Sequence, residues 1–156
     1  MAITMKLAVL LRQVFQLLGG PKLAVGDVVK LLGPIDTDPG IPVSIRLRPA
    51  SPDLKSASLS RYPESGVPYL ITLEPVPNAR PTLHDLQEIF GEYRRGLGSA
   101  RKIVEFIFYP HVPGAPWQIA VIARLGGPSA NFDAEPVRTI SFRRDPAVDQ
   151  AQEEAR

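Results

Sequence analysis

Histidine and cysteine supply much of the metal and nucleophilic chemistry of proteins, and this chain of 156 residues has two histidines and no cysteine. The lack of cysteine excludes thiolate zinc sites, iron–sulfur clusters, cysteine nucleophiles and disulfides. A histidine metal site would need His84 and His111 together with carboxylates, and their spacing indicates none. We therefore expect no metal and no cofactor, and we favour a protein without catalytic residues. An enzyme that uses one of the histidines on a small anionic substrate is an alternative.

The segment from Pro110 to Trp117 has the composition of a recognition loop. Three prolines and one glycine precede the tryptophan, and prolines lower the entropy that a loop loses when it is held still against a partner. Tryptophan is a frequent anchor of protein interfaces. His111 and Trp117 are therefore candidate partner-binding residues. The competing interpretation is a tight hairpin connection whose tryptophan enters the core.

A second candidate site is a run of positive charge. Four cationic residues lie within nine positions that contain no acidic residue, and they could bind an anion or a nucleic-acid backbone. Acidic residues are nearly as numerous as basic ones overall, and no aromatic residues alternate with this cluster, so a solvated face is the competing interpretation. The cluster consists of Arg94, Arg95, Arg101 and Lys102, and Arg46, Arg48, Arg138, Arg143 and Arg144 would extend it if their strands are neighbours.

Three segments have the signals of helices. Apolar residues at helical spacing predict one over residues 7–18, which Gly19 and Gly20 end. A short helix over residues 27–32 is expected with Asp27 as its N-cap, although a strand is also compatible with the two valines there.

The third helix has the clearest start signal. Thr82 can cap it, and Asp85 stands three residues later in a variant of the capping box. Its apolar stripe continues to Leu97, so we expect the helix to end at Gly96 or Gly98.

The rest of the chain alternates in the manner of strands, with proline-rich and glycine-rich turns between them. The two most apolar segments have the pattern of central strands that are covered on both faces. The expected strands are 43–47, 57–61, 67–74, 102–109, 117–125 and 137–144, of which the two most apolar are 102–109 and 117–125.

This order predicts a single α+β domain over residues 1–146, with a mainly antiparallel sheet of about five or six strands and two or three helices on one face. Residues 147–156 form an acidic C-terminal segment that we expect to be flexible. The order of elements resembles that of the small bacterial secretion chaperones. That resemblance is one of element order.

The apolar run over residues 7–11 is too short for a secretory signal, and no segment approaches the roughly 20 apolar residues of a membrane span. A cytoplasmic protein without membrane partners is therefore expected. The leading hypothesis is a non-catalytic protein-binding or accessory module, such as a chaperone, inhibitor or immunity-type protein. Nucleic-acid binding through the cationic cluster is the alternative, and a homo-oligomer is also compatible with the sequence.

Overall fold

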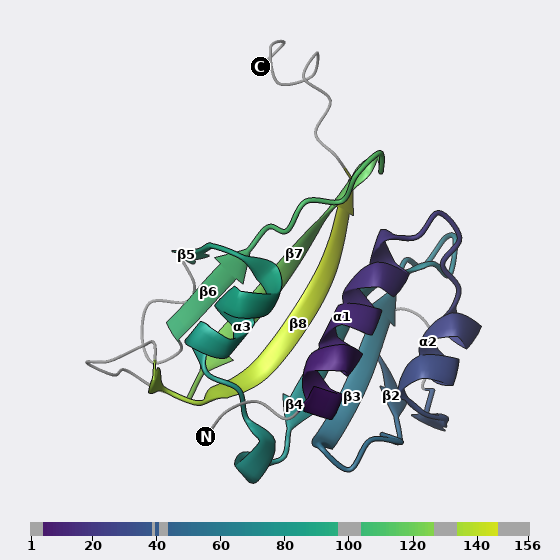
Figure 1. The fold of residues 1–156 in the computed structure, drawn as a ribbon. Coiled ribbons are helices and arrows are strands. Elements are labelled where there is room, and N and C mark those ends of the chain that lie inside the picture. The colour runs from purple at the N-terminus through teal and green to yellow at the C-terminus, as the bar shows by residue number, and fades with distance from the viewer. Residues whose placement is uncertain (1–4, 39, 41–43, 97–103, 127–133, 147–156) are drawn as a thin grey trace.

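A computed structural model describes residues 5–38, 40, 44–96, 104–126 and 134–146. Within these ranges, eight antiparallel strands form one sheet in the order β1-β2-β3-β4-β8-β7-β6-β5. Three α-helices lie on one face of this sheet (Figure 1). The helices are α1 (Met5–Gly19), α2 (Val25–Leu32) and α3 (Leu83–Phe90), with a 3-10 turn at Pro77–Ala79; the strands are β1 (Ile35–Thr37), β2 (Ile45–Leu47), β3 (Leu54–Arg61), β4 (Pro68–Pro75), β5 (Tyr93–Arg95), β6 (Val104–Phe108), β7 (Trp117–Leu125) and β8 (Val137–Pro146).

The two halves of the chain follow the same plan. Each half places helical structure before four strands, and each set of four pairs in chain order as an antiparallel meander. The halves meet where β4 pairs with β8, with Ile71 opposite Phe142 and Thr72 opposite Ser141. One continuous sheet therefore depends on this central pair of strands.

Helix α1 forms as its periodicity predicts. The side chains at the helical spacing are buried, with Leu7, Leu11, Val14 and Leu18 at 0% exposure. They pack in one apolar cluster with the inward side chains of the sheet, and α1 contacts β7 and β8. None of the described helices is long and apolar enough to cross a membrane.

Helix α2 confirms the second expected helix and corrects its start. It begins at Val25, so Asp27 lies inside its first turn instead of at the N-cap. The Asp27 carboxylate accepts a hydrogen bond of 3.0 Å from the backbone N–H of Ala24. A carboxylate in this position offsets an unpaired donor at the helix start and the positive end of the helix dipole. Gly33 ends the helix, as expected.

Helix α3 begins with the capping box that the sequence predicts. The Thr82 hydroxyl accepts a hydrogen bond from the backbone N–H of Asp85 at 3.2 Å, and the Asp85 carboxylate accepts one from the N–H of Thr82 at 2.9 Å. Two donors that the helix itself cannot satisfy are thereby paired.

We expect Thr82→Ala to lower the free energy of unfolding by about 0.5–2 kcal/mol, because one of these donors loses its acceptor. Urea unfolding followed by circular dichroism measures the change. Gln87→Ala, at an exposed position of the same helix, is the matched control and should alter stability by less than about 0.5 kcal/mol. Equal losses in the two variants would show that the cap does not hold the helix start.

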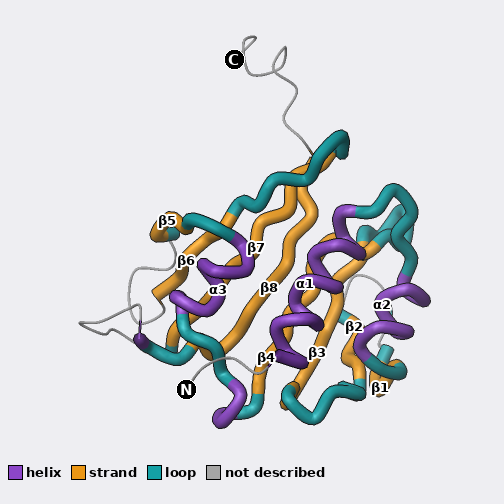
Figure 2. The backbone as a smooth tube through the Cα atoms, viewed as in Figure 1, coloured by secondary structure: helices purple, strands orange, loops and turns teal. Residues whose placement is uncertain are grey.

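The third helix ends earlier than its apolar stripe suggested. Helix α3 stops at Phe90, and Gly91 follows it with φ of +88°, a conformation that favours glycine. Figure 2 shows the chain continuing as a loop and then as strand β5. Tyr93 therefore lies on a strand, where its ring packs edge-on against Phe106 at 5.2 Å between centroids. The expected helix over residues 91–97 is wrong within the part that the structure describes.

The sheet has eight strands, so the expected number of five or six is too low. The two additional strands, β1 and β5, have three residues each and form the two edges of the sheet. Three residues are too few to show a period of two, and an edge strand lacks the buried apolar run of a central one. Because of this, the segment over residues 35–37 resembled part of a turn and the segment over residues 93–95 resembled the end of a helix.

The two most apolar strands were expected to be covered on both faces, but the helices lie on one face of the sheet, and only one of these strands has consecutive buried residues. In β7, the five consecutive residues from Ile119 to Ala123 are all buried. In β6, burial alternates: Glu105 and Ile107 are only half-buried, between buried neighbours. The central strands of the sheet are β4 and β8.

Candidate binding site at one end of the sheet

Antiparallel pairing brings five chain segments to the same end of the sheet. The ends of β3, β6 and β8 lie beside the starts of β4 and β7, as the pairs Arg61 with Pro68 and Gln118 with Asp145 show. The connection between β6 and β7 extends past the sheet at this end, near the C-terminal end of α1 (Figure 1). The proline-rich loop and the turn between β3 and β4 therefore border the same surface.

Trp117 joins this loop to helix α1. Its indole N–H donates a hydrogen bond of 3.3 Å to the carbonyl oxygen of Gly19 at the helix end, where carbonyls lack partners within the helix. The indole is half-buried and packs against the apolar core. The guanidinium of Arg144 stacks on one face of the indole, with its Cζ 3.6 Å from the ring centroid. Such a stacked cation and ring attract each other through the charge distribution of the ring.

Two hollows lie beside Trp117, which lines both. The first, which we call the Trp117 cleft, has a volume of about 300 Å³, and the second, the loop hollow, about 310 Å³. Both are at the small end of the range of ligand pockets, roughly 300–1,000 Å³. The cleft is lined by Tyr62, Ser65, Val67, Pro68, Pro116, Trp117 and Arg144, and the loop hollow by Tyr109, Pro110, His111, Val112, Ala115, Trp117 and Gln118.

Two exposed tyrosines stand at these hollows. Tyr62 is 41% exposed and stacks on Tyr69 with 4.6 Å between ring centroids. Tyr109 is 42% exposed at the end of the loop hollow nearest β6. Aromatic side chains that are held in place but left open to solvent are common at the centres of protein interfaces.

Arg144 is the charged group of the Trp117 cleft. Its Nη1 atom is enclosed and has no hydrogen-bond partner within the described ranges. Burial lowers the pKa of Arg144 below its ordinary value, and the Coulombic effect of Tyr62 opposes this shift. A guanidinium that has lost water without gaining an acceptor is less well solvated than one on an open surface.

Two other arginines at the ends of β3 and β8, Arg61 and Arg143, differ from Arg144 in having a carboxylate partner, although the Nε atom of Arg61 is also enclosed without a hydrogen-bond partner among the described residues. Arg61 donates to the Asp38 carboxylate at 2.8 Å. Arg143 donates through Nε to both carboxylate oxygens of Asp145 at 3.0 Å. Arg144 forms no ion pair with any carboxylate that the structure describes, and its guanidinium lies on the indole face instead.

The two histidines lie at opposite ends of the sheet. His84 lies in the first turn of α3, shortly after Thr82, which bridges to Pro136 just before β8 begins. His111 lies in the loop between β6 and β7, which is at the end of the sheet where β8 finishes. His84 forms an exposed pair with Glu88, with 3.3 Å between Nε2 and Oε1. The described residues include no group of three histidine, aspartate or glutamate side chains that could hold a metal ion.

The cationic cluster predicted from the sequence is only partly described. Arg94 and Arg95 lie exposed on the edge strand β5, and Arg101 and Lys102 fall outside the described residues. The strands that would extend the cluster are not neighbours, since two strands separate β2 from β8 and two more separate β8 from β5. Three strand spacings correspond to about 14 Å. Arg46 and Arg143 therefore do not continue the charge of β5 as one patch.

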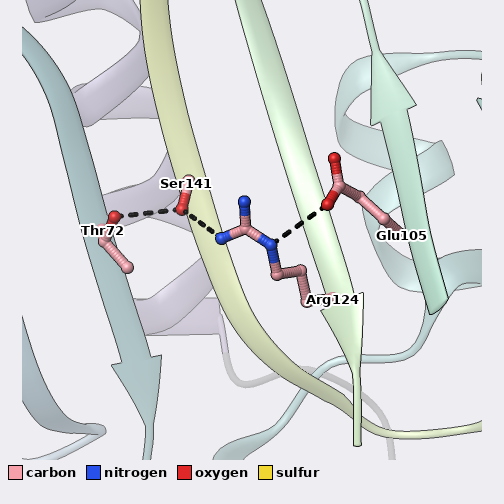
Figure 3. Close-up of polar contacts among 4 residues, drawn as sticks. All are labelled: Thr72, Glu105, Arg124 and Ser141. Carbon is pink, nitrogen blue, oxygen red and sulfur yellow. Dashed lines mark hydrogen bonds and ion pairs between the residues drawn. The ribbon is translucent and has the colours of Figure 1, made fainter. Parts of the chain in front are cut away.

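The face of the sheet opposite the helices carries a polar row (Figure 3). The Ser141 hydroxyl lies 3.0 Å from that of Thr72 and accepts from Arg124 at 3.4 Å, and Arg124 also donates to Glu105 at 3.2 Å. Ser141 is 1% exposed, and no histidine or carboxylate among the described residues hydrogen-bonds to it. The row therefore pairs its own polar groups across four strands and does not have the serine and base of a nucleophilic site.

The Trp117 cleft contains residues that the sequence reasoning did not select. Tyr62 and Val67 come from the turn between β3 and β4 and Pro68 from the start of β4, about fifty positions before Trp117 in the chain. A signal for Arg144 was present, because alternation places it in phase with the apolar Ile140 and Phe142 on the inward side of β8. The adjacent Arg143 must then face the opposite side.

Comparisons of the chain with family models, with curated proteins and with solved structures give no match.

Proposed function

We propose that this protein is a non-catalytic binding module that recognises an extended segment of a partner protein at the end of the sheet where Trp117 lies. The observation that supports this most directly is the pair of hollows that Trp117 lines, each with an exposed tyrosine. Two adjacent hollows of this size suit two successive anchoring side chains of one segment better than one large cofactor.

The loop between β6 and β7 is suited to such recognition. Its three prolines restrict its backbone, and Trp117 fixes one end of it to α1 through the bond to Gly19. A loop that is ordered before binding loses little conformational entropy when a partner docks. His111 is exposed in this loop and would contact a segment lying in the loop hollow.

Tyr62 and Tyr109 are the residues with which to test this proposal. Trp117 is unsuitable, because its loss would also remove a contact with the core and with α1. A photo-crosslinking side chain placed at His111 should capture a partner that the same side chain at His84, also exposed but at the other end of the sheet, does not capture. The captured protein is then purified and its affinity measured.

We expect the double variant Tyr62→Ser with Tyr109→Ser to bind that partner at least about tenfold more weakly, because truncation of an anchoring aromatic residue costs more than 1 kcal/mol. His84→Ala should bind within about twofold of the original protein, since surface changes outside an interface have little effect. An unchanged affinity of the double variant would refute the proposal. So would equal crosslinking from the two positions, or salt-sensitive retention on an oligonucleotide that Arg94→Ala with Arg95→Ala abolishes.

A further inference from the structure

We infer that the Trp117 cleft is a carboxylate-binding site anchored by Arg144, and that the segment it accepts presents a carboxylate beside an apolar side chain. This inference rests on the proposed function and names the chemistry of the partner. It is carried by the contrast between Arg144, which lacks an ion pair among the described residues, and the paired Arg61 and Arg143.

The environment of Arg144 favours an anion in the cleft. The guanidinium lines a concave surface whose other walls are largely apolar, with Val67, Pro68 and Pro116 among them. An ion pair is stronger where its surroundings hold less water. Because the enclosed Nη1 already lacks an acceptor, part of the cost of desolvating the guanidinium is present before any ligand arrives.

The size and charge of the cleft favour a carboxylate over a phosphate. Among the described residues that line the cleft, Arg144 is the one cationic residue, so it balances a single negative charge. A phosphate group at neutral pH carries more charge than this and is usually bound by several cations or backbone N–H groups. A guanidinium also matches the two oxygens of a carboxylate with two parallel hydrogen bonds.

The apolar walls of the cleft indicate which kind of side chain lies next to that carboxylate in the bound segment. The ring of Tyr62, the indole of Trp117 and the two prolines offer apolar surface within the same 300 Å³. A leucine-sized or aromatic side chain next to the charged group would bury its surface there. The carboxylate itself could belong to an acidic side chain or to the C-terminus of the partner, and the test separates these two sources.

The fluorescence of Trp117 reports on binding in this experiment. Trp117 is the chain's only tryptophan, and the guanidinium of Arg144 stacks on its ring. Two short peptides without aromatic residues are titrated against the full-length protein. One has blocked ends and a glutamate between two leucines, and the other has a free C-terminal carboxylate on a leucine. Their neutral partners carry glutamine in place of glutamate, or a C-terminal amide. Saturable changes in fluorescence give the affinities.

We expect at least one carboxylate peptide to bind about 10- to 100-fold more tightly than its neutral partner, the effect of a hydrogen bond to a charged group. The peptide that shows this difference identifies the source of the carboxylate. Arg144→Gln should remove the difference by weakening the carboxylate peptide and leaving the neutral one unchanged. Arg144→Lys, which keeps the charge and loses the planar fork, should give an intermediate result.

Arg143→Gln is the matched control, because it removes an adjacent arginine that faces the other side of β8 and pairs with Asp145. It should leave both affinities within about twofold of the original values. Circular dichroism establishes that each variant is folded. If Arg144→Gln does not fold, the comparison of carboxylate and neutral peptides on the unchanged protein still decides the matter.

Equal affinities for the carboxylate peptides and their neutral partners would overturn the inference, as would the absence of any saturable change at millimolar peptide. Its failure is distinguishable from failure of the proposed function. If the tyrosine variants weaken partner binding while the peptides show no preference for a carboxylate, only the inference is wrong. If the peptides show the carboxylate preference and the tyrosine variants bind the partner with unchanged affinity, the proposed function is wrong.

Discussion

Phe142→Ala is expected to lower the free energy of unfolding by about 3–5 kcal/mol, the usual cost of removing a buried phenyl ring and leaving a cavity. Phe142 is fully buried in the middle of β8, between Ile71 of β4 and Val121 of β7. Its ring meets that of Phe90 edge to face, with 5.9 Å between centroids. Since domains of this size are stable by about 5–15 kcal/mol, the loss is a large part of the total.

The effect should be large because Phe142 lies where the two meanders join. Its strand supplies the pairing between the halves of the chain, and its ring also contacts α3 through Phe90. Urea unfolding followed by the fluorescence of Trp117 gives the change in stability. Arg143→Ala is the control, as the neighbouring side chain faces the open side of the sheet and its pair with Asp145 is partly exposed. That variant should lose less than about 1 kcal/mol, and equal losses would contradict the central position of β8.

Gly33→Ala is expected to destabilise the protein by about 2–6 kcal/mol, since it combines backbone strain with a steric clash. Gly33 has φ of +137°, and a Cβ atom there would lie 1.9 Å from the carbonyl oxygen of Arg48. The segment that carries this oxygen cannot move away easily. Two backbone hydrogen bonds of 2.8 Å hold it, from Arg48 N–H to the carbonyl of Pro34 and from Ala50 N–H to that of Leu32.

The matched control for this prediction is a glycine whose replacement by alanine should raise the stability instead of lowering it. Gly26 lies inside α2, and a Cβ atom there would meet nothing within 4 Å. Gly26→Ala should therefore stabilise the protein by about 0.5–1 kcal/mol, because alanine has the higher helix propensity. Thermal unfolding of the two variants distinguishes them directly. A stable Gly33→Ala variant would show that the segment around Arg48 does not pack against the end of α2 as described.

The long elements of this fold were predictable because their signals are local. The leucine stripe of α1 and the Thr82 capping box act within one or two helical turns. The expected strands correspond to β2, β3, β4, β6, β7 and β8, and the α+β class with helices on one face is confirmed. Spacing alone defines which face of a helix or strand is apolar, so these features follow from neighbouring residues.

Other features depended on contacts between distant residues. The edge strands β1 and β5 exist because β2 and β6 offer them unpaired backbone groups, not because three residues favour a strand. From the sequence alone, Tyr93 could belong to the apolar face of a helix or to a strand. The pairing of β5 with β6 places it on a strand, where its ring contacts Phe106. Gly91 was the local sign that the helix had ended, since its positive φ is compatible with a helix end and not with its interior.

The candidate site shows the same division. The proline-rich loop, His111 and Trp117 stand together in the chain, and their residue types alone indicate a stiff loop that could present an anchor. Tyr62, Pro68 and Arg144 reach Trp117 only because β3, β4, β7 and β8 pair antiparallel and bring their ends together. Strand register is set by burial of whole faces and by the order of strands, which no single segment contains. Local patterns thus specified the elements and one wall of the cleft, while the pairing of strands far apart in the chain placed the arginine on the tryptophan.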